Sequence, residues 1–85
     1  MTEGKDTRVA LIGIIIEDTD AAGELNGLLH QYNDSIIGRM GVPHREKGVS
    51  VISIVIDAPQ DDINALSGKL GAVKGVSTKT VYSQA

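Results

Sequence analysis

The second half of this 85-residue chain repeats its first half, and that repeat limits the folds open to it. At an offset of 41 residues, Asp20 aligns with Asp61, and the motif LNGLL at 25–29 aligns with LSGKL at 66–70. Two copies of one motif in so short a chain predict two copies of one supersecondary unit, packed together into a single domain.

Each half contains apolar residues at the spacing of an amphipathic helix. Their positions follow i, i+3, i+7 and i+10, so they share one face of a helix. The two sets are Ala22, Leu25, Leu29 and Tyr32 in the first half and Ile63, Leu66, Leu70 and Val73 in the second. We therefore predict one helix in each half, with this apolar face turned toward the core.

Gly27 and Gly68 occupy equivalent positions inside these predicted helices. Because glycine in a helix interior is less stable than alanine by about 1 kcal/mol, its presence needs a reason. We interpret the pair as points of close approach, either between the two helices or between a helix and the sheet. Gly71 is expected at the C-terminus of the second helix.

Runs that favour β-strands stand on both sides of each predicted helix. RVALIGIII at 8–16 and VSVISIVI at 49–56 precede the helices, and SIIGRMGV at 35–42 and GVSTKTVY at 75–82 follow them. This order predicts an α+β fold, the ferredoxin-like βαββαβ sandwich, with a four-stranded antiparallel sheet and two helices on one face. The first and third strands are expected in the centre, and the second and fourth at the edges.

We expect a single domain over residues 8–83, preceded by a flexible N-terminal tail at 1–7. Within it, the two central strands are apolar on both faces. In the first strand Val9, Leu11 and Ile15 alternate with Ala10, Ile12, Ile14 and Ile16, and in the third Val49, Val51 and Val55 alternate with Ile52, Ile54 and Ile56. An exposed apolar sheet face is a liability for a monomer. The pattern therefore predicts a homo-oligomer, a dimer or a tetramer, assembled partly through the helix-free face.

The composition excludes several classes of function. The chain has no cysteine, which removes disulfides and thiolate metal sites, and its formal charge of −3 argues against direct nucleic-acid binding. Its aromatic residues are only two tyrosines, so the sheet has little on which to stack bases. No run is long enough to cross a membrane, and nothing resembles a secretory signal, so we expect a cytoplasmic protein.

No catalytic constellation is visible, and we expect neither an enzyme nor a resident cofactor. No serine stands in a nucleophile motif. His30 and His44 lack the spacing of metal ligands, and His30 is expected near the C-terminus of the first helix, where a cation is favourable. A metal site built across subunits from both histidines and an acid is a minor alternative.

The segment GRMGVPHREKG at 38–48 concentrates basic groups in an acidic protein. It holds three of the eight Lys and Arg residues and one of the two histidines. We expect a hairpin connection over roughly residues 41–48. The candidate ligand-binding residues are Arg39, His44, Arg45 and Lys47, because guanidinium groups bind carboxylates and phosphates in a bidentate manner. The alternatives are pairing with acids across a subunit interface and a solvated hairpin tip.

The chain also resembles a known family. The segment IIGRMGVPHREKGVSVISIVID at 36–57, followed by ALSGKLG and KGVSTKT, is similar to the small proteins called iron-only hydrogenase system regulators, and the similarity extends from about Arg8 to Tyr82. The resemblance implies an ACT-like ferredoxin fold, similar to the C-terminal, ligand-binding domain of nickel-responsive regulators, and homo-oligomers. It also implies a regulatory role for a protein encoded beside hydrogenase maturation genes.

Two functions remain open at this point. The first is a regulatory oligomer of ACT type that senses a small ligand, with a small anionic effector at a subunit interface. The second is an interaction module that binds a protein partner and no small molecule.

Overall fold

A computed structural model describes residues 6–84 and shows the predicted order of elements. The strands are β1 (Thr7–Ile16), β2 (Ile36–His44), β3 (Val49–Pro59) and β4 (Val76–Tyr82), and the helices are α1 (Ala22–Gln31) and α2 (Gln60–Gly71). Short 3-10 turns at Thr19–Ala21, Asn33–Ser35 and Arg45–Lys47 connect them. Of the tail predicted at 1–7, residues 1–5 lie outside the described residues, and Thr7 begins β1.

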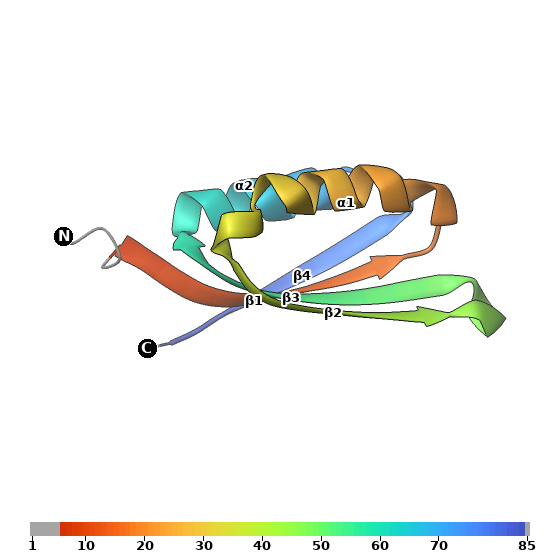
Figure 1. The fold of residues 1–85 in the computed structure, drawn as a ribbon, viewed down its shortest axis with the longest axis horizontal. Coiled ribbons are helices and arrows are strands. Elements are labelled where there is room, and N and C mark those ends of the chain that lie inside the picture. Colours follow the sequence, from red (N-terminus) through yellow and green to blue (C-terminus); the bar gives the residue numbers. More distant parts are fainter. Residues whose placement is uncertain (1–5, 85) are drawn as a thin grey trace.

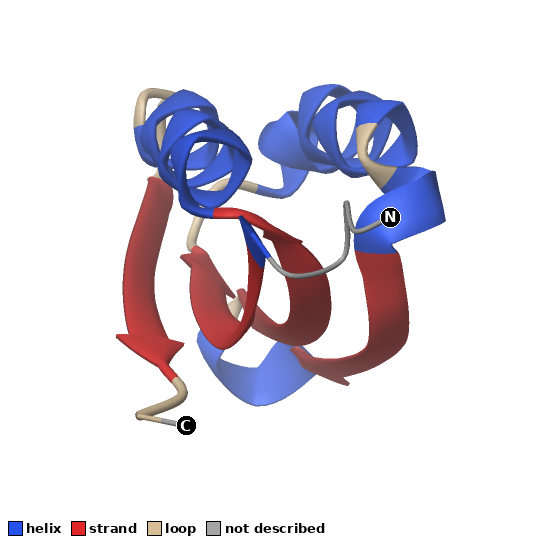
Figure 2. Cartoon of the chain, turned by 90° about the vertical axis from the view of Figure 1, so that its left-hand side faces the viewer, coloured by secondary structure: helices blue, strands red, loops and turns tan. Residues whose placement is uncertain are grey.

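The four strands form one antiparallel sheet in the order β2-β3-β1-β4. Both helices cover one face of this sheet, and the other face is open (Figures 1 and 2). The predicted ferredoxin-like βαββαβ fold is therefore confirmed, as is the placement of the first and third strands in the centre.

The core lies between the helices and the covered face of the sheet. Alternate residues of the two central strands are buried there, and the second helical stripe is buried along its whole length: Ala10, Ile12, Ile14, Ile16, Ile52, Ile54, Ile56, Ile63, Leu66, Leu70 and Val73. The first stripe follows the prediction at Leu25 and Leu29, which are buried, and at Tyr32, which packs against the core.

The first position of that stripe differs from the prediction. Ala22 is exposed, and Ala21 is buried in its place. The cause is the 3-10 turn that precedes α1, which has a tighter helical repeat than an α-helix. Asp18 caps this turn, because its side-chain oxygen accepts a hydrogen bond from the backbone N–H of Asp20 at 3.0 Å.

The interpretation of Gly27 and Gly68 as points of close approach is wrong. Both are exposed, and a Cβ atom added at either would meet no atom of another described element within 4 Å. Gly71 is the last residue of α2, as predicted.

Two glycines with positive φ shape the turns. Gly48 (φ 67°) ends the 3-10 turn of the β2–β3 hairpin, and Gly75 (φ 80°) precedes β4. The hairpin connection is shorter than the predicted 41–48, because β2 continues through Pro43 to His44. Proline is tolerated there because β2 is an edge strand, where one row of backbone N–H groups needs no partner in the sheet.

Candidate functional site

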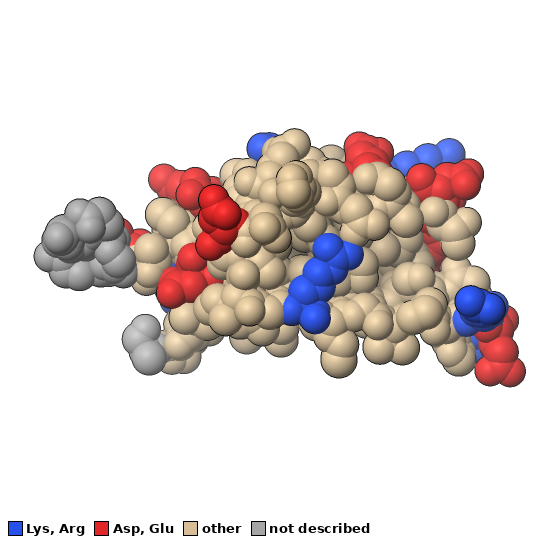
Figure 3. Space-filling model, viewed as in Figure 1, with Lys and Arg blue, Asp and Glu red and all other residues tan. Residues whose placement is uncertain are grey.

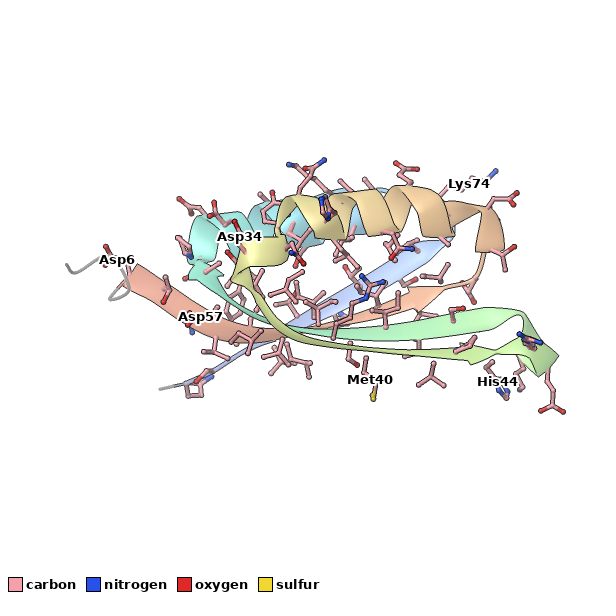
Figure 4. The ribbon with its side chains drawn as sticks, in the orientation of Figure 1. Asp6, Asp34, Met40, His44, Asp57 and Lys74 are labelled. Carbon is pink, nitrogen blue, oxygen red and sulfur yellow. The ribbon has the colours of Figure 1, made fainter. Side chains whose placement is uncertain are left out.

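The open face of the sheet is apolar over all four strands. Its exposed large side chains are Val9, Leu11, Ile15, Met40, Val42, Val51 and Val81, and Val49 and Val55 lie half-buried among them. Met40 is 61% exposed, and Figure 4 shows it pointing away from the helices. We call this set of nine residues the open face.

The middle of the open face is a row with two small residues, Gly13 and Ser53, at its centre. Gly13 pairs with Ser53 on one side and with Lys79 on the other, and Ser53 pairs with Met40. A hollow of about 260 Å³ lies beside this row, lined by Gly13, Ile14, Ile15, Val51, Ser77, Thr78 and Lys79. The centre of the face is therefore recessed between larger aliphatic side chains.

The four predicted ligand-binding residues do not form one cluster, because Arg39 lies beside α1 and the other three lie at the hairpin tip. Arg39 pairs with Ile54, a residue of the covered face, and its guanidinium donates a hydrogen bond to Oδ1 of Asn26 on α1. His44 ends β2, and Arg45 and Lys47 belong to the 3-10 turn at the hairpin tip. Arg39 and Arg45 thus line different hollows and do not converge on one site.

The hollow at the hairpin tip measures about 210 Å³ and is lined by Thr19, Pro43, His44, Arg45, Gly48, Val49 and Ser50. The last residue of β1, Ile16, pairs with Ser50, so the acidic residues Glu17 and Asp18 lie at this end of the sheet. Asp57 pairs with Val9 and lies at the opposite end. Acidic and basic side chains both occur near the tip, at the right of Figure 3.

A larger hollow of about 340 Å³ lies between α1 and the edge strand β2. Its lining residues are Asn26, Leu29, His30, Asn33, Ile36, Ile37, Gly38 and Arg39. We call it the α1–β2 hollow. Figure 3 shows a basic side chain lying across the middle of this side of the molecule, while the acidic side chains gather toward its ends.

The polar residues of the α1–β2 hollow were not predicted, apart from Arg39. Asn26, His30 and Asn33 follow the spacing i, i+4 and i+7, which places them on one side of α1 and the turn after it. That spacing is a signal in the sequence, but such a polar stripe usually faces solvent.

The described residues bring together no group of three His, Asp or Glu side chains that could hold a metal ion. His30 and His44 line different hollows, so the minor alternative of a shared metal site gains no support within one chain. Within residues 6–84, no helix is long and apolar enough to cross a membrane.

Comparisons with known proteins agree on the fold and the family. The family described as "Iron-only hydrogenase system regulator, putative" (TM1266-like) matches residues 8–80. The solved structure of the uncharacterized protein TM1266 from Thermotoga maritima is 37% identical with a TM-score of 0.88, covering 92% of this chain and 99% of that one. The ACT domain of GTP pyrophosphokinase from Chlorobium tepidum is 20% identical with a TM-score of 0.73, covering 88% and 99%.

A curated relative from Saccharolobus solfataricus is named "Putative nickel-responsive regulator". It is 26% identical over 74 residues, which are 87% of this chain but 55% of that protein. The chain thus spans about half the length of this relative. The resemblance to nickel-responsive regulators and the ACT-like fold are both confirmed. By the match over residues 8–80, the chain belongs to the TM1266-like family of iron-only hydrogenase system regulators.

Proposed function

We propose that this protein is a cytoplasmic, homo-oligomeric regulator of ACT-like type that senses a small anionic effector and has no enzymatic activity. The name of its family supports a role in the iron-only hydrogenase system. The observation that carries the proposal is the open face, to which all four strands of the sheet contribute exposed or half-buried apolar side chains.

A second copy of the chain is the occupant that fits the open face best. Leu11 on a central strand is 44% exposed, and Val81 at the edge is 65% exposed. Burial of aliphatic surface stabilises an interface by about 25 cal/mol for each Å² removed from water. An isologous interface uses the same patch twice, so an apolar patch with few charges complements itself.

Two observations support an anionic effector. The α1–β2 hollow contains the guanidinium of Arg39, and the hollow at the hairpin tip contains the side chains of His44 and Arg45. Among the described residues, neither hollow has an Asp or Glu in its lining. A basic lining without acids favours carboxylate or phosphate ligands.

An interaction module without a small ligand is the second candidate, and the open face favours it too. A protein partner could cover Leu11 and Val81 as well as a second copy could. The two functions differ in what the purified protein contains, since an interaction module alone carries no bound small molecule.

Sedimentation equilibrium at micromolar concentration, together with native mass spectrometry, tests the proposal. We expect a dimer or a tetramer, and a small anion that co-purifies with it or binds on addition. A mass of 8.9 kDa, that of the single chain, would contradict the assembly and favour a partner of another sequence. An oligomer that binds no anion would contradict the sensing role.

The role of the hairpin tip is tested separately with Arg45→Ala. If the tip holds an anion, phosphate raises the melting temperature of the wild type at constant ionic strength, and the variant loses that rise. If Arg45 and Lys47 pair with acids of a neighbouring subunit, the variant assembles more weakly and phosphate has no effect. If neither property changes, the tip is a solvated turn.

A further inference from the structure

We propose that the α1–β2 hollow is a binding site for a small carboxylate with a short aliphatic body. This inference rests on the proposed sensing function and assigns the effector's chemical class and its place. It is distinct from the hairpin tip, because the two hollows have no lining residue in common.

The hollow exists because β2 is irregular where it passes α1. A register shift between Ile36 and Gly38 leaves Ile37 without a partner in the ladder, which is a β-bulge. Gly38 follows and pairs with Val55 of the open face, whereas Ile36 and Arg39 pair with Ile56 and Ile54 of the covered face. The bulge therefore places two residues instead of one between Ile36 and Arg39, and this wider spacing leaves room between the strand and the helix.

The polar groups around the hollow offer several hydrogen-bond donors. Arginine only donates, so the bond from Arg39 to Asn26 fixes Oδ1 of Asn26 as the acceptor and leaves its amide NH₂ able to donate to a ligand. Asn33 and His30 each carry an N–H group of their own. A guanidinium and three further donors suit a ligand that is rich in acceptors and negatively charged.

Arg39 differs from the other arginine that folds back onto the domain. Arg8 donates to Oε1 of Gln60 at 3.1 Å and to the carbonyl of Ser83 at 3.0 Å, and its guanidinium lies 4.6 Å from the centre of the Tyr82 ring. Arg8 is thus occupied by structural contacts. Within the described part of the chain, Arg39 bonds Asn26 alone, so four of its five N–H donors are available to a ligand.

The remaining lining selects a carboxylate over inorganic phosphate. Of its apolar lining residues, Ile36 is half-buried and Ile37 is 64% exposed, while Leu29 is buried behind them in the core. Ile36 and Ile37 can contact a short hydrocarbon chain, which phosphate lacks. The volume of about 340 Å³ stands at the lower end of the usual range for ligand pockets, about 300–1,000 Å³, so the ligand is small.

Butyrate is a suitable probe, followed by ¹H–¹⁵N correlation spectra of the full chain at constant ionic strength. We expect saturating shifts in the backbone amides of Gly38 and Arg39 and in the side-chain amides of Asn26 and Asn33, with a dissociation constant in the millimolar range. Chloride should give no saturating shifts, and phosphate should bind more weakly than butyrate because it has no apolar part.

Arg39→Gln should weaken butyrate binding about tenfold or more, because the one charged donor is lost. Arg39→Lys keeps the charge but not the planar fork, so its affinity should fall between those of the wild type and Arg39→Gln. Lys74→Gln is the matched control, since it removes one positive charge at an exposed position outside both hollows and should leave butyrate binding unchanged.

Three results would overturn the site: shifts that rise linearly without saturation, saturating shifts centred on His44 and Arg45, or butyrate binding that survives Arg39→Gln in a folded variant. The test of this site can fail or succeed independently of the test of the proposed oligomeric sensor. A monomer that binds butyrate at Arg39 keeps the site and contradicts the oligomer, and an oligomer that binds phosphate only at the tip keeps the sensor and contradicts the site.

Discussion

Arg39 and Met40 are consecutive residues of β2, and they lie on opposite sides of the sheet. Arg39 pairs with Ile54 of the covered face and reaches Asn26 on α1, whereas Met40 pairs with Ser53 and belongs to the open face. One edge strand therefore contributes both to the α1–β2 hollow and to the surface we assign to assembly.

This arrangement predicts that two neighbouring substitutions have separate effects. Met40→Ala should raise the dissociation constant of the oligomer about fivefold to tenfold and leave butyrate binding unchanged, because a large apolar contact is lost from the interface alone. Arg39→Gln should weaken butyrate binding and leave the dissociation constant of the oligomer unchanged. Sedimentation equilibrium and the butyrate titration, run on both variants, measure the two effects. If both substitutions weaken assembly equally, the two faces do not have separate roles.

A carboxylate at the centre of the open face should prevent assembly without unfolding the chain. Leu11→Glu places a charge where a second copy would exclude water, and burying an unpaired charge costs several kcal/mol. We expect a folded monomer by sedimentation and circular dichroism. Ala65→Glu is the control, since Ala65 is exposed on α2, on the helix side of the molecule. An oligomer that tolerates Leu11→Glu would show that another surface holds it together.

The buried helical stripe should dominate the stability of the domain. Leu70→Ala removes a fully buried side chain and should lower the free energy of unfolding by about 2–5 kcal/mol. Asp61→Ala should lower it by about 1 kcal/mol at most, because Asp61 only complements the positive end of α2 from its first turn. Urea midpoints give the ranking, and the reverse order would contradict the packing described for α2.

The two positive-φ glycines should differ in their response to alanine. Gly48→Ala should cost about 1–2 kcal/mol, the strain of a Cβ atom in the left-handed region, since no atom lies within 4 Å of the added group. Gly75→Ala should cost more, because its Cβ would lie 2.5 Å from Cβ of Asp18. Denaturant unfolding of both variants tests this. Equal losses would mean that the Asp18 loop moves aside freely.

The regular features of this fold could be predicted because they rest on simple periods. The alternation of Ala10, Ile12 and Ile14 with Val9 and Leu11 identified two apolar sheet faces, and the helical spacing of Leu66 and Leu70 identified the core face of α2. The repeat then gave the element order, from which the positions of the central and edge strands follow.

The features that were missed depend on local irregularities. The 3-10 turn before α1 moved the buried position from Ala22 to Ala21, and β2 extended through Pro43 because an edge strand tolerates proline. The α1–β2 hollow depends on the bulge at Ile37, which follows from the three-dimensional fit between strand and helix. No periodic pattern in the sequence reports such a fit.

The strand order has a consequence for how the chain folds. β1 pairs with β3 and β4, and β2 pairs with β3, so every strand pairing joins one repeat unit to the other. Apart from the β2–β3 hairpin, these pairings close long loops, and such a topology slows folding because chain entropy is lost before the contacts form. Cleavage within Arg45–Lys47 would give two fragments with no strand pairing of their own. Neither would fold alone, and their mixture would recover the domain at a rate that depends on the concentration of both.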